Sequence, residues 1–161
     1  MSMQRRADAI DAALLHALID NPDATNIAVS EATGLARNTV RSRLGRYAEE
    51  QTLRTFERRI DPAFLGYPLS AYVVTKVTQR KLTSVSQALG DIPEVIEVQG
   101  LSGLNDLLVH VVARDADDLY RVAGRILATD GVKRTNTGLV MRELVSYRIA
   151  QLIGVHDSLS Q

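Results

Sequence analysis

Residues 25–47 read TNIAVSEATGLARNTVRSRLGRY, and this stretch decides the fold of the N-terminal part of the chain. Its pattern predicts two short helices that meet at a turn around Gly34. In the second helix Val40, Leu44 and Tyr47 recur at i, i+4 and i+7, so one face should pack against a core. The opposite face carries small polar and cationic side chains, which can reach base edges and phosphates in a major groove. Two helices joined by a glycine-containing turn are the arrangement of a helix-turn-helix.

Helices are also predicted before this stretch and in its first half. Residues 7–20 have helical spacing of apolar side chains, and Asn21-Pro22 should end that helix, because proline biases its predecessor away from the helical region. The apolar positions are Ile10, Leu14, Ala17 and Leu18. In the first helix of the helix-turn-helix the predicted apolar side consists of Ile27, Ala28 and Ala32. Each helix therefore has an apolar side to bury.

The positive charge of the chain is local. The formal net charge is zero, with 19 Lys and Arg against 19 Asp and Glu. Residues 36–60 nevertheless hold seven arginines against three glutamates, a balance of +4, whereas residues 1–35 have a balance of −3. Arginine favours planar, bidentate contacts to phosphate or guanine. This charge distribution favours a nucleic-acid contact in residues 36–60, although arginines on an exposed helix face can also be merely solvated.

The candidate DNA contacts lie in the second helix and just after it. Residues 53–60, LRTFERRI, alternate well enough to suggest a short hairpin, the wing of a winged helix. Side chains there would lie near the DNA backbone and add affinity without sequence information. The base-facing candidates are Asn38, Thr39, Arg41 and Ser42. The phosphate-binding candidates are Arg37, Arg43, Arg46, Arg54 and Arg58.

A second domain is predicted beyond a boundary at residues 61–68, which contain two prolines and a glycine. Strands are predicted over residues 69–78, 95–101, 107–113 and 132–141, and helices over 82–89 and 115–128. The order β-α-β-β-α-β is that of a ferredoxin-like domain, a four-stranded antiparallel sheet with both helices on one face. The fold class is α+β: a winged helix-turn-helix (1–60), a linker (61–68), a βαββαβ domain (69–150) and a tail (151–161) that could pack as a short helix.

The sheet face without helices is expected to need a cover. The strand at residues 107–113 is apolar on both sides apart from His110, so a monomer would expose a large apolar patch. We therefore expect sheet-to-sheet or edge-to-edge dimerisation. His110 is interpreted either as an ordinary hydrogen-bonded strand residue or as a pH-sensitive interface residue.

The composition excludes several classes of protein. The chain has no cysteine, so it can have neither a disulfide framework nor a thiolate metal site. No window approaches the roughly 18 apolar residues of a membrane span, and the N-terminal residues lack the apolar run of a signal peptide, so a cytoplasmic location is expected. His16, His110 and His156 are scattered, and no glycine-rich phosphate loop follows a strand. We therefore expect no catalytic site, metal or cofactor, and not an enzyme.

The order and spacing of these motifs resemble the Lrp/AsnC family of leucine-responsive and asparagine-responsive regulators. The residues that carry the resemblance are Ile10-Asp11, Leu14, Leu18, Gly34-Leu35, Val40 to Leu44, Asp61-Pro62, Leu65-Gly66, Leu89, Ile92 to Val95, Gly103, Asp106 and Gly131 to Thr137. The resemblance implies a bacterial or archaeal transcription regulator that binds double-stranded DNA. It also implies an ACT-like C-terminal domain that assembles homodimers into octamers or other rings and senses an amino acid or similar effector.

The resemblance further implies an effector site in the loop after the second strand. Relatives have a pattern close to Gly-Asp-x-Asp there, whereas this chain has Gly103, Leu104, Asn105 and Asp106. An apolar Leu104 at the first acidic position removes a counter-charge for an ammonium group. A carboxylate-bearing ligand would still find backbone N–H groups and the side chains of Thr135, Asn136 and Thr137. Alternatively, the loop only builds a tight turn.

A second departure from the family pattern is Ala36, where relatives usually have a serine that caps the reading helix. Alanine cannot cap, which weakens a helix end by roughly 1 kcal/mol. An oligomeric sensor or scaffold that has lost DNA binding is therefore the alternative to a DNA-binding regulator.

Overall fold

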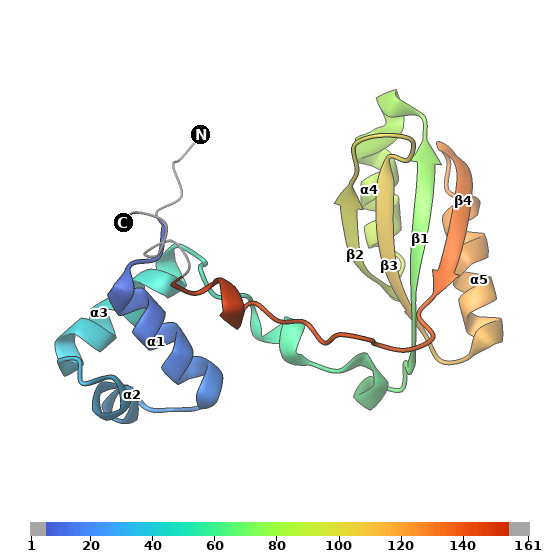
Figure 1. The fold of residues 1–161 in the computed structure, drawn as a ribbon. Coiled ribbons are helices and arrows are strands. Elements are labelled where there is room, and N and C mark those ends of the chain that lie inside the picture. The colour runs from blue at the N-terminus through green and yellow to red at the C-terminus, as the bar shows by residue number, and fades with distance from the viewer. Residues whose placement is uncertain (1–5, 155–161) are drawn as a thin grey trace. The chain divides into compact units, whose positions relative to one another are not determined.

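The computed structural model describes residues 6–154. They belong to two compact units, one made of residues up to 55 together with residues from 145 onward, and the other of residues 56–144 (Figure 1). The first unit is helical, and the second contains a four-stranded sheet. Each unit has its own hydrophobic core.

The helical unit confirms the predicted helix-turn-helix. Its helices are α1 (Ala9–Asp20), α2 (Asn26–Thr33) and α3 (Arg37–Glu49). Leu14, Val29 and Val40, one from each helix, are fully buried and form the centre of the core. The predicted apolar side of α2 is wrong, because Ile27 is 48% exposed. Val29 lies two residues further on, on the opposite side of the helix, and is the residue that α2 buries.

The helix ends are fixed by local hydrogen bonds. Asp8 and Asp11 form a capping box at the start of α1, in which each carboxylate accepts the other residue's backbone N–H. Thr25 caps α2 by accepting the N–H of Ala28. Gly34 ends α2 with φ of 71°, a left-handed conformation that glycine adopts without a steric cost. The left-handed conformation of Gly34 turns the chain between α2 and α3.

The predicted wing is wrong. Residues 53–60 form no strand, and Phe56–Arg59 form a 3-10 helix instead. Every residue from 51 to 60 is exposed, so the alternating side chains have no core or sheet to pack against. The Arg59 guanidinium lies over the Phe56 ring, 5.3 Å from its centroid.

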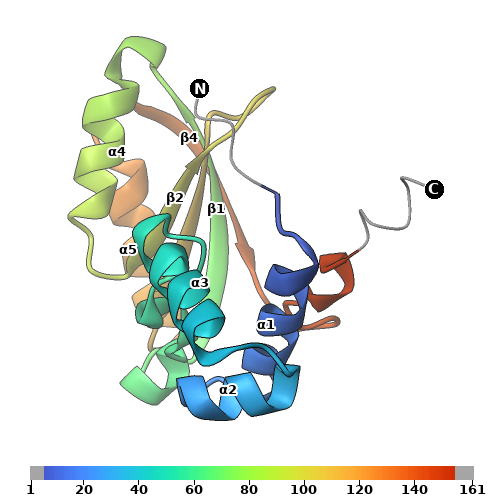
Figure 2. The ribbon, with the colours of Figure 1, turned by 90° about the vertical axis from the view of Figure 1, so that its left-hand side faces the viewer.

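The second unit confirms the predicted βαββαβ order. Its elements are β1 (Leu69–Val77), α4 (Leu82–Gly90), β2 (Val95–Gly100), β3 (Leu107–Ala113), α5 (Ala116–Leu127) and β4 (Val132–Leu139). The strand order is β2-β3-β1-β4, and every neighbouring pair is antiparallel. Both α4 and α5 lie on the same side of the sheet (Figure 2). The core lies between the helices and the sheet, and includes Val73, Val109, Val85 and Ile126.

The other face of the sheet is mixed in character. Tyr72 on β1 is 41% exposed and stacks on His110 of β3, with ring centroids 4.4 Å apart. His110 Nε2 is 2.8 Å from Ser70 Oγ, so it is a hydrogen-bonded strand histidine. Burial lowers the pKa of His110, while the charge of Glu97 opposes that shift. We call this face, with Tyr72, Val74, Leu108 and His110 at its centre, the open face.

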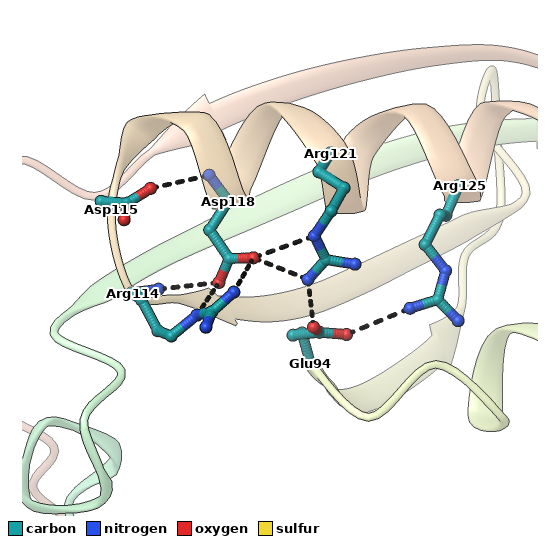
Figure 3. A network of polar contacts seen from close by, with 6 residues as sticks. All are labelled: Glu94, Arg114, Asp115, Asp118, Arg121 and Arg125. Carbon is teal, nitrogen blue, oxygen red and sulfur yellow. Dashed lines mark hydrogen bonds and ion pairs between the residues drawn. The ribbon is translucent and has the colours of Figure 1, made fainter.

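A polar network joins α5 to Glu94, just before β2, and to Arg114, just after β3 (Figure 3). Asp118 accepts hydrogen bonds from the Arg114 and Arg121 side chains and from the Arg114 N–H. These bonds hold the pKa of Asp118 far below its usual range. Arg121 also donates to the buried Glu94, which Arg125 approaches to 3.5 Å.

Two further expectations concern the tail and membranes. The predicted tail helix is observed only as a 3-10 turn at Ala150–Leu152, and residues 155–161 lie outside the described part of the chain. Among residues 6–154, no helix has the length and hydrophobicity needed to span a membrane.

Two features require a glycine at position 131, between α5 and β4: its backbone conformation and its close neighbours. Its φ is +101°, and a Cβ there would lie 2.9 Å from Val85 Cγ2 and 3.0 Å from Lys81 Cβ. We predict that Gly131→Ala lowers the free energy of unfolding by about 2 kcal/mol or more, through strain and overpacking. Chemical denaturation measures this change. Gly138→Ala is the control, because its nearest contact would be Tyr72 O at 3.9 Å; equal losses in both variants would contradict the prediction.

Candidate functional site

The exposed face of α3 carries most of the predicted DNA contacts. Arg37, Asn38, Arg41 and Ser42 are exposed, and Thr39 is half-buried. A shallow hollow on this face is lined by Asn38, Arg41, Ser42, Gly45, Arg46 and Glu49. The opposite face of α3 buries Val40 and Tyr47 in the unit. The helix therefore presents its polar and cationic side away from the core.

Arg43 lies on the inward side of α3, although the sequence placed it among the phosphate contacts. Its Nη1 is 2.7 Å from Asp8 Oδ2 and 2.7 Å from Asp11 Oδ1, and its side chain is 17% exposed. Arg46 contacts the same Asp11 oxygen at 3.2 Å, and Tyr47 Oη donates to it at 2.7 Å. We call Asp11 with its α3 partners Arg43, Arg46 and Tyr47 the Asp11 cluster. It ties α1 to α3.

The hydrogen bonds of the Asp11 cluster outweigh the effect of burial on the pKa of Asp11. Burial raises the pKa of Asp11, but hydrogen bonds from Tyr47, from the Asp8 N–H and from Arg43 together bring that pKa below its ordinary value. Burial and the bond to Asp11 raise the pKa of Tyr47. Hydrogen bonds to Asp8 and Asp11 raise the pKa of Arg43. At neutral pH Asp11 is therefore a carboxylate, Arg43 a guanidinium and Tyr47 a phenol.

The start of α3 lacks a side-chain cap, as expected from Ala36. Its backbone is extended, with φ of −61° and ψ of 140°, which is the conformation of an N-cap residue. The first N–H groups of α3 are thus not satisfied by a side chain at the cap position. A helix N-terminus of this kind attracts anions.

The last two predicted phosphate contacts do not form a wing. Arg54 is exposed and lies in the helical unit, whereas Arg58 lies in the second unit. Arg58 Nη2 is 2.6 Å from Glu97 Oε1 on β2. The structure therefore does not bring these two arginines together on one element.

The predicted effector loop joins β2 to β3. Gly103 has φ of +105°, and Leu104 at the tip is 87% exposed. Asp106 is buried, and it accepts hydrogen bonds from the Val77 N–H at 2.8 Å, from Gln79 Nε2 at 2.6 Å and from Lys76 Nζ at 3.2 Å. These bonds, the backbone bond first, lower the pKa of Asp106. Asp106 thus joins the loop to the end of β1.

The second half of the predicted effector site lies on β4. Thr135 is opposite Thr75 of β1, and Thr137 is opposite Val73, so both face the helix side with those buried residues. Asn136 is opposite Val74 and faces the open side. Because β1 lies between β3 and β4, Thr135, Asn136 and Thr137 do not converge with Gly103, Leu104 and Asn105 within one chain. Asp106 and Thr135 lie on either side of Thr75: the Asp106 N–H donates to the Thr75 carbonyl, and Thr135 pairs with Thr75 across the strands.

Lys76 and Gln79 were missed by the sequence reasoning. Both contact Asp106 from more than 25 residues away in sequence, and no local pattern connects them. The Asp11 cluster was also missed, although Asp11 falls on the apolar side of α1, three residues before Leu14. Such a position indicates a buried charge that needs partners.

Within residues 6–154, no group of three or more acidic or histidine side chains could hold a metal ion.

A helix-turn-helix with an outward cationic helix, joined to a βαββαβ domain, defines a transcription regulator of the helix-turn-helix type. The family described as AsnC-type helix-turn-helix domain matches residues 8–47, and the Lrp/AsnC ligand binding domain matches residues 70–150. The chain belongs to the Lrp/AsnC family. It is thus a regulator with a DNA-binding and a ligand-binding domain, and not an enzyme.

Individual relatives agree with this assignment. The HTH-type transcriptional regulator FL11 of Pyrococcus horikoshii is 30% identical over 135 residues, 84% of this chain and 89% of the relative. The HTH-type transcriptional regulator AldR of Mycolicibacterium smegmatis is 33% identical over 144 residues, 87% of this chain and 84% of the relative.

Solved structures share the fold. Escherichia coli AsnC has a TM-score of 0.80 at 20% identity, covering 91% of this chain and 99% of that one. A feast or famine regulatory protein from M. tuberculosis, complexed with L-methionine, has a TM-score of 0.76 at 26% identity, covering 88% of this chain and 97% of that one.

The Asp11 cluster predicts a large effect of Asp11→Ala. Removing this carboxylate leaves the buried Tyr47 hydroxyl and the Arg43 guanidinium without their shared acceptor. Breaking a buried ion pair from one side costs about 3–5 kcal/mol, and we expect a loss of this size in the free energy of unfolding. Urea denaturation, monitored by the circular dichroism signal of the helices, measures this loss. Asp20→Ala, at an exposed position of the same helix, should change stability by less than about 0.5 kcal/mol; comparable losses would contradict the assignment.

Proposed function

We propose that the protein binds a specific double-stranded DNA site as a homodimer, through the exposed face of α3. The observation that carries this proposal is the division of α3 into a buried apolar side and an outward side with Arg37, Asn38, Arg41 and Ser42. Two reading helices in a dimer would enter successive major grooves, about one helical turn (~34–36 Å) apart. A DNA-binding regulator acts where the chromosome is, so the expected cytoplasmic location is part of this proposal.

The proposed contacts differ in kind. Arg41 and Ser42 lie on the middle of the outward face, where side chains reach base edges, with Asn38 and the half-buried Thr39 one turn earlier. Arg37, exposed in the first turn of α3, is proposed to hold a phosphate. Arg46 lines the hollow and is proposed to hold a phosphate there. Arg43 has a different role, because its ion pairs with Asp8 and Asp11 orient α3. Arg54 remains a candidate for phosphate binding. Arg58 is not part of the proposed DNA interface, because it pairs with Glu97.

Dimerisation is proposed to use the open face. Tyr72 is 41% exposed there, and Val74 and Leu108 are half-buried. Single apolar residues on a surface are ordinary, but neighbouring ones on adjacent strands form a patch that association would cover. Assembly of dimers into octamers or other rings remains part of the same proposal, supported by the family membership.

The effector is proposed to be a small molecule that carries a carboxylate. A relative's structure contains L-methionine, which supports an amino-acid-like ligand. The loop of this chain, however, offers no free acid for an ammonium group: Leu104 is apolar, and Asp106 is already bonded to Val77, Gln79 and Lys76. Two separate sets of groups remain as candidate partners for a carboxylate: the backbone N–H groups of the exposed loop residues Gly103 and Leu104, and the polar side chains of β4. The ligand would alter DNA binding only if it binds one assembly state better than another.

The alternative function is an oligomeric sensor or scaffold that does not bind DNA. The uncapped start of α3 at Ala36 is the observation in its favour. A gel-shift with the upstream region of the protein's own gene separates the two functions, because only a DNA-binding regulator retards that duplex.

Arg41→Ala tests the reading face. We expect a loss of about 1–3 kcal/mol in DNA-binding free energy if Arg41 grips a guanine, with relaxed preference at that base pair. Fluorescence anisotropy with labelled duplexes at several salt concentrations measures both effects. Arg80→Ala, an exposed arginine of the other unit, is the control and should leave affinity nearly unchanged. An unchanged affinity of Arg41→Ala would remove this residue from the proposed interface.

Leu104→Asp tests the effector proposal. L-methionine and the same molecule without its amino group serve as probes, and Leu104→Asn controls for the loss of the leucine. Because a ligand that binds the native state raises the melting temperature, thermal shift reports binding. The wild-type shift should not depend on the amino group, whereas Leu104→Asp should gain a larger shift with L-methionine. A wild-type shift with L-methionine alone would contradict the proposal.

A further inference from the structure

Gly45 stands in the interior of α3, where glycine is unfavourable. It is the ninth residue of a helix that runs Arg37–Glu49. Glycine in a helix interior is destabilising relative to alanine, because it loses more backbone freedom on folding. A residue that weakens a helix at such a position requires an explanation from its surroundings.

Nothing within the described chain explains this glycine. A Cβ at position 45 would meet no atom within 4 Å, and the backbone there does not have the positive φ that favours glycine. Gly131 differs on both counts, since its φ is positive and a Cβ would clash with Val85. The fold of the chain therefore requires glycine at 131 but not at 45.

Gly45 lies on the exposed face of α3, which is the proposed DNA-binding face. It lies on the same face as Asn38, Arg41 and Ser42, which are seven, four and three residues earlier. Together with Arg46 and Glu49 these residues line the hollow on α3. The missing side chain contributes to the hollow at the centre of the face proposed to meet the duplex.

We propose that Gly45 lets the sugar–phosphate backbone of one DNA strand lie directly against α3. This inference rests on the proposed function. Arg41 and Arg46 line the hollow on either side of Gly45 in sequence, so cationic groups flank the point of approach. Glu49 lies one turn further along the same face and repels phosphate. The DNA strand therefore crosses α3 at Gly45 and does not run along it.

The test is Gly45→Ala, with Gly124→Ala as the matched control. Gly124 is an exposed glycine inside α5, and a Cβ there would also meet nothing within 4 Å. Both substitutions should raise the melting temperature of their unit by about 4 °C, because alanine favours the helix. Only Gly45→Ala should weaken DNA binding, by about tenfold, since its methyl group holds the strand away from α3. Gly45→Gln, with a longer side chain, should weaken binding further.

The measurement uses the full-length protein and two duplexes of equal length. One contains the upstream region of the protein's own gene, and the other has a scrambled sequence. A backbone contact is independent of sequence, so Gly45→Ala should lose the same factor on both duplexes. Unchanged affinity of Gly45→Ala, or a loss on the first duplex alone, would overturn the proposal. If the wild type binds neither duplex, the proposed function itself fails, and the inference fails with it.

Discussion

The hydrogen bonds to the Asp11 carboxylate are the interaction on which the orientation of α3, the proposed reading helix, depends. The carboxylate lies on α1 and receives Arg43, Arg46 and Tyr47 from three positions on α3. Hydrophobic contacts among Leu14, Val29 and Val40 hold the helices together, but they are not directional. Hydrogen bonds to a single buried acid fix the rotation of α3 about its own axis. That rotation decides which side chains face outward.

The same interaction gives the arginines of α3 different roles: some pair with acids inside the unit, and others are exposed on its surface. Arg43 pairs with the buried Asp11 and the half-buried Asp8, and Arg46 pairs with Asp11 while also lining the outward hollow. Arg37 and Arg41 are exposed. A count of cations in the sequence therefore overstates the charge that a duplex could meet. Arg43 serves the structure of the helical unit, because a buried carboxylate such as Asp11 is destabilising without a partner.

The sequence was a good guide wherever periodicity and turn chemistry decide the outcome. The helical spacing of Val40, Leu44 and Tyr47, the turn at Gly34 and the βαββαβ order all appear in the structure. The predicted wing is wrong because alternation alone does not make a strand: residues 53–60 are exposed and pair with no strand among residues 6–154. The Asp106 bonds to Lys76 and Gln79 could not be predicted, since they depend on the strand register that brings distant residues together. In the candidate site, Arg41 is exposed and Arg43 is mostly buried. The spacing of the two arginines in the sequence does not show this difference.

The bonds of Asp106 also determine how the β2–β3 loop can behave. Its carboxylate holds the N–H of Val77, and its own N–H is held by the carbonyl of Thr75, so the loop is anchored twice to β1. β1 is a central strand, paired with β3 on one side and β4 on the other, so the loop is bonded to the middle of the sheet. The loop is therefore fixed to β1 at Asp106, whereas Leu104 at its tip is 87% exposed and lies away from these bonds.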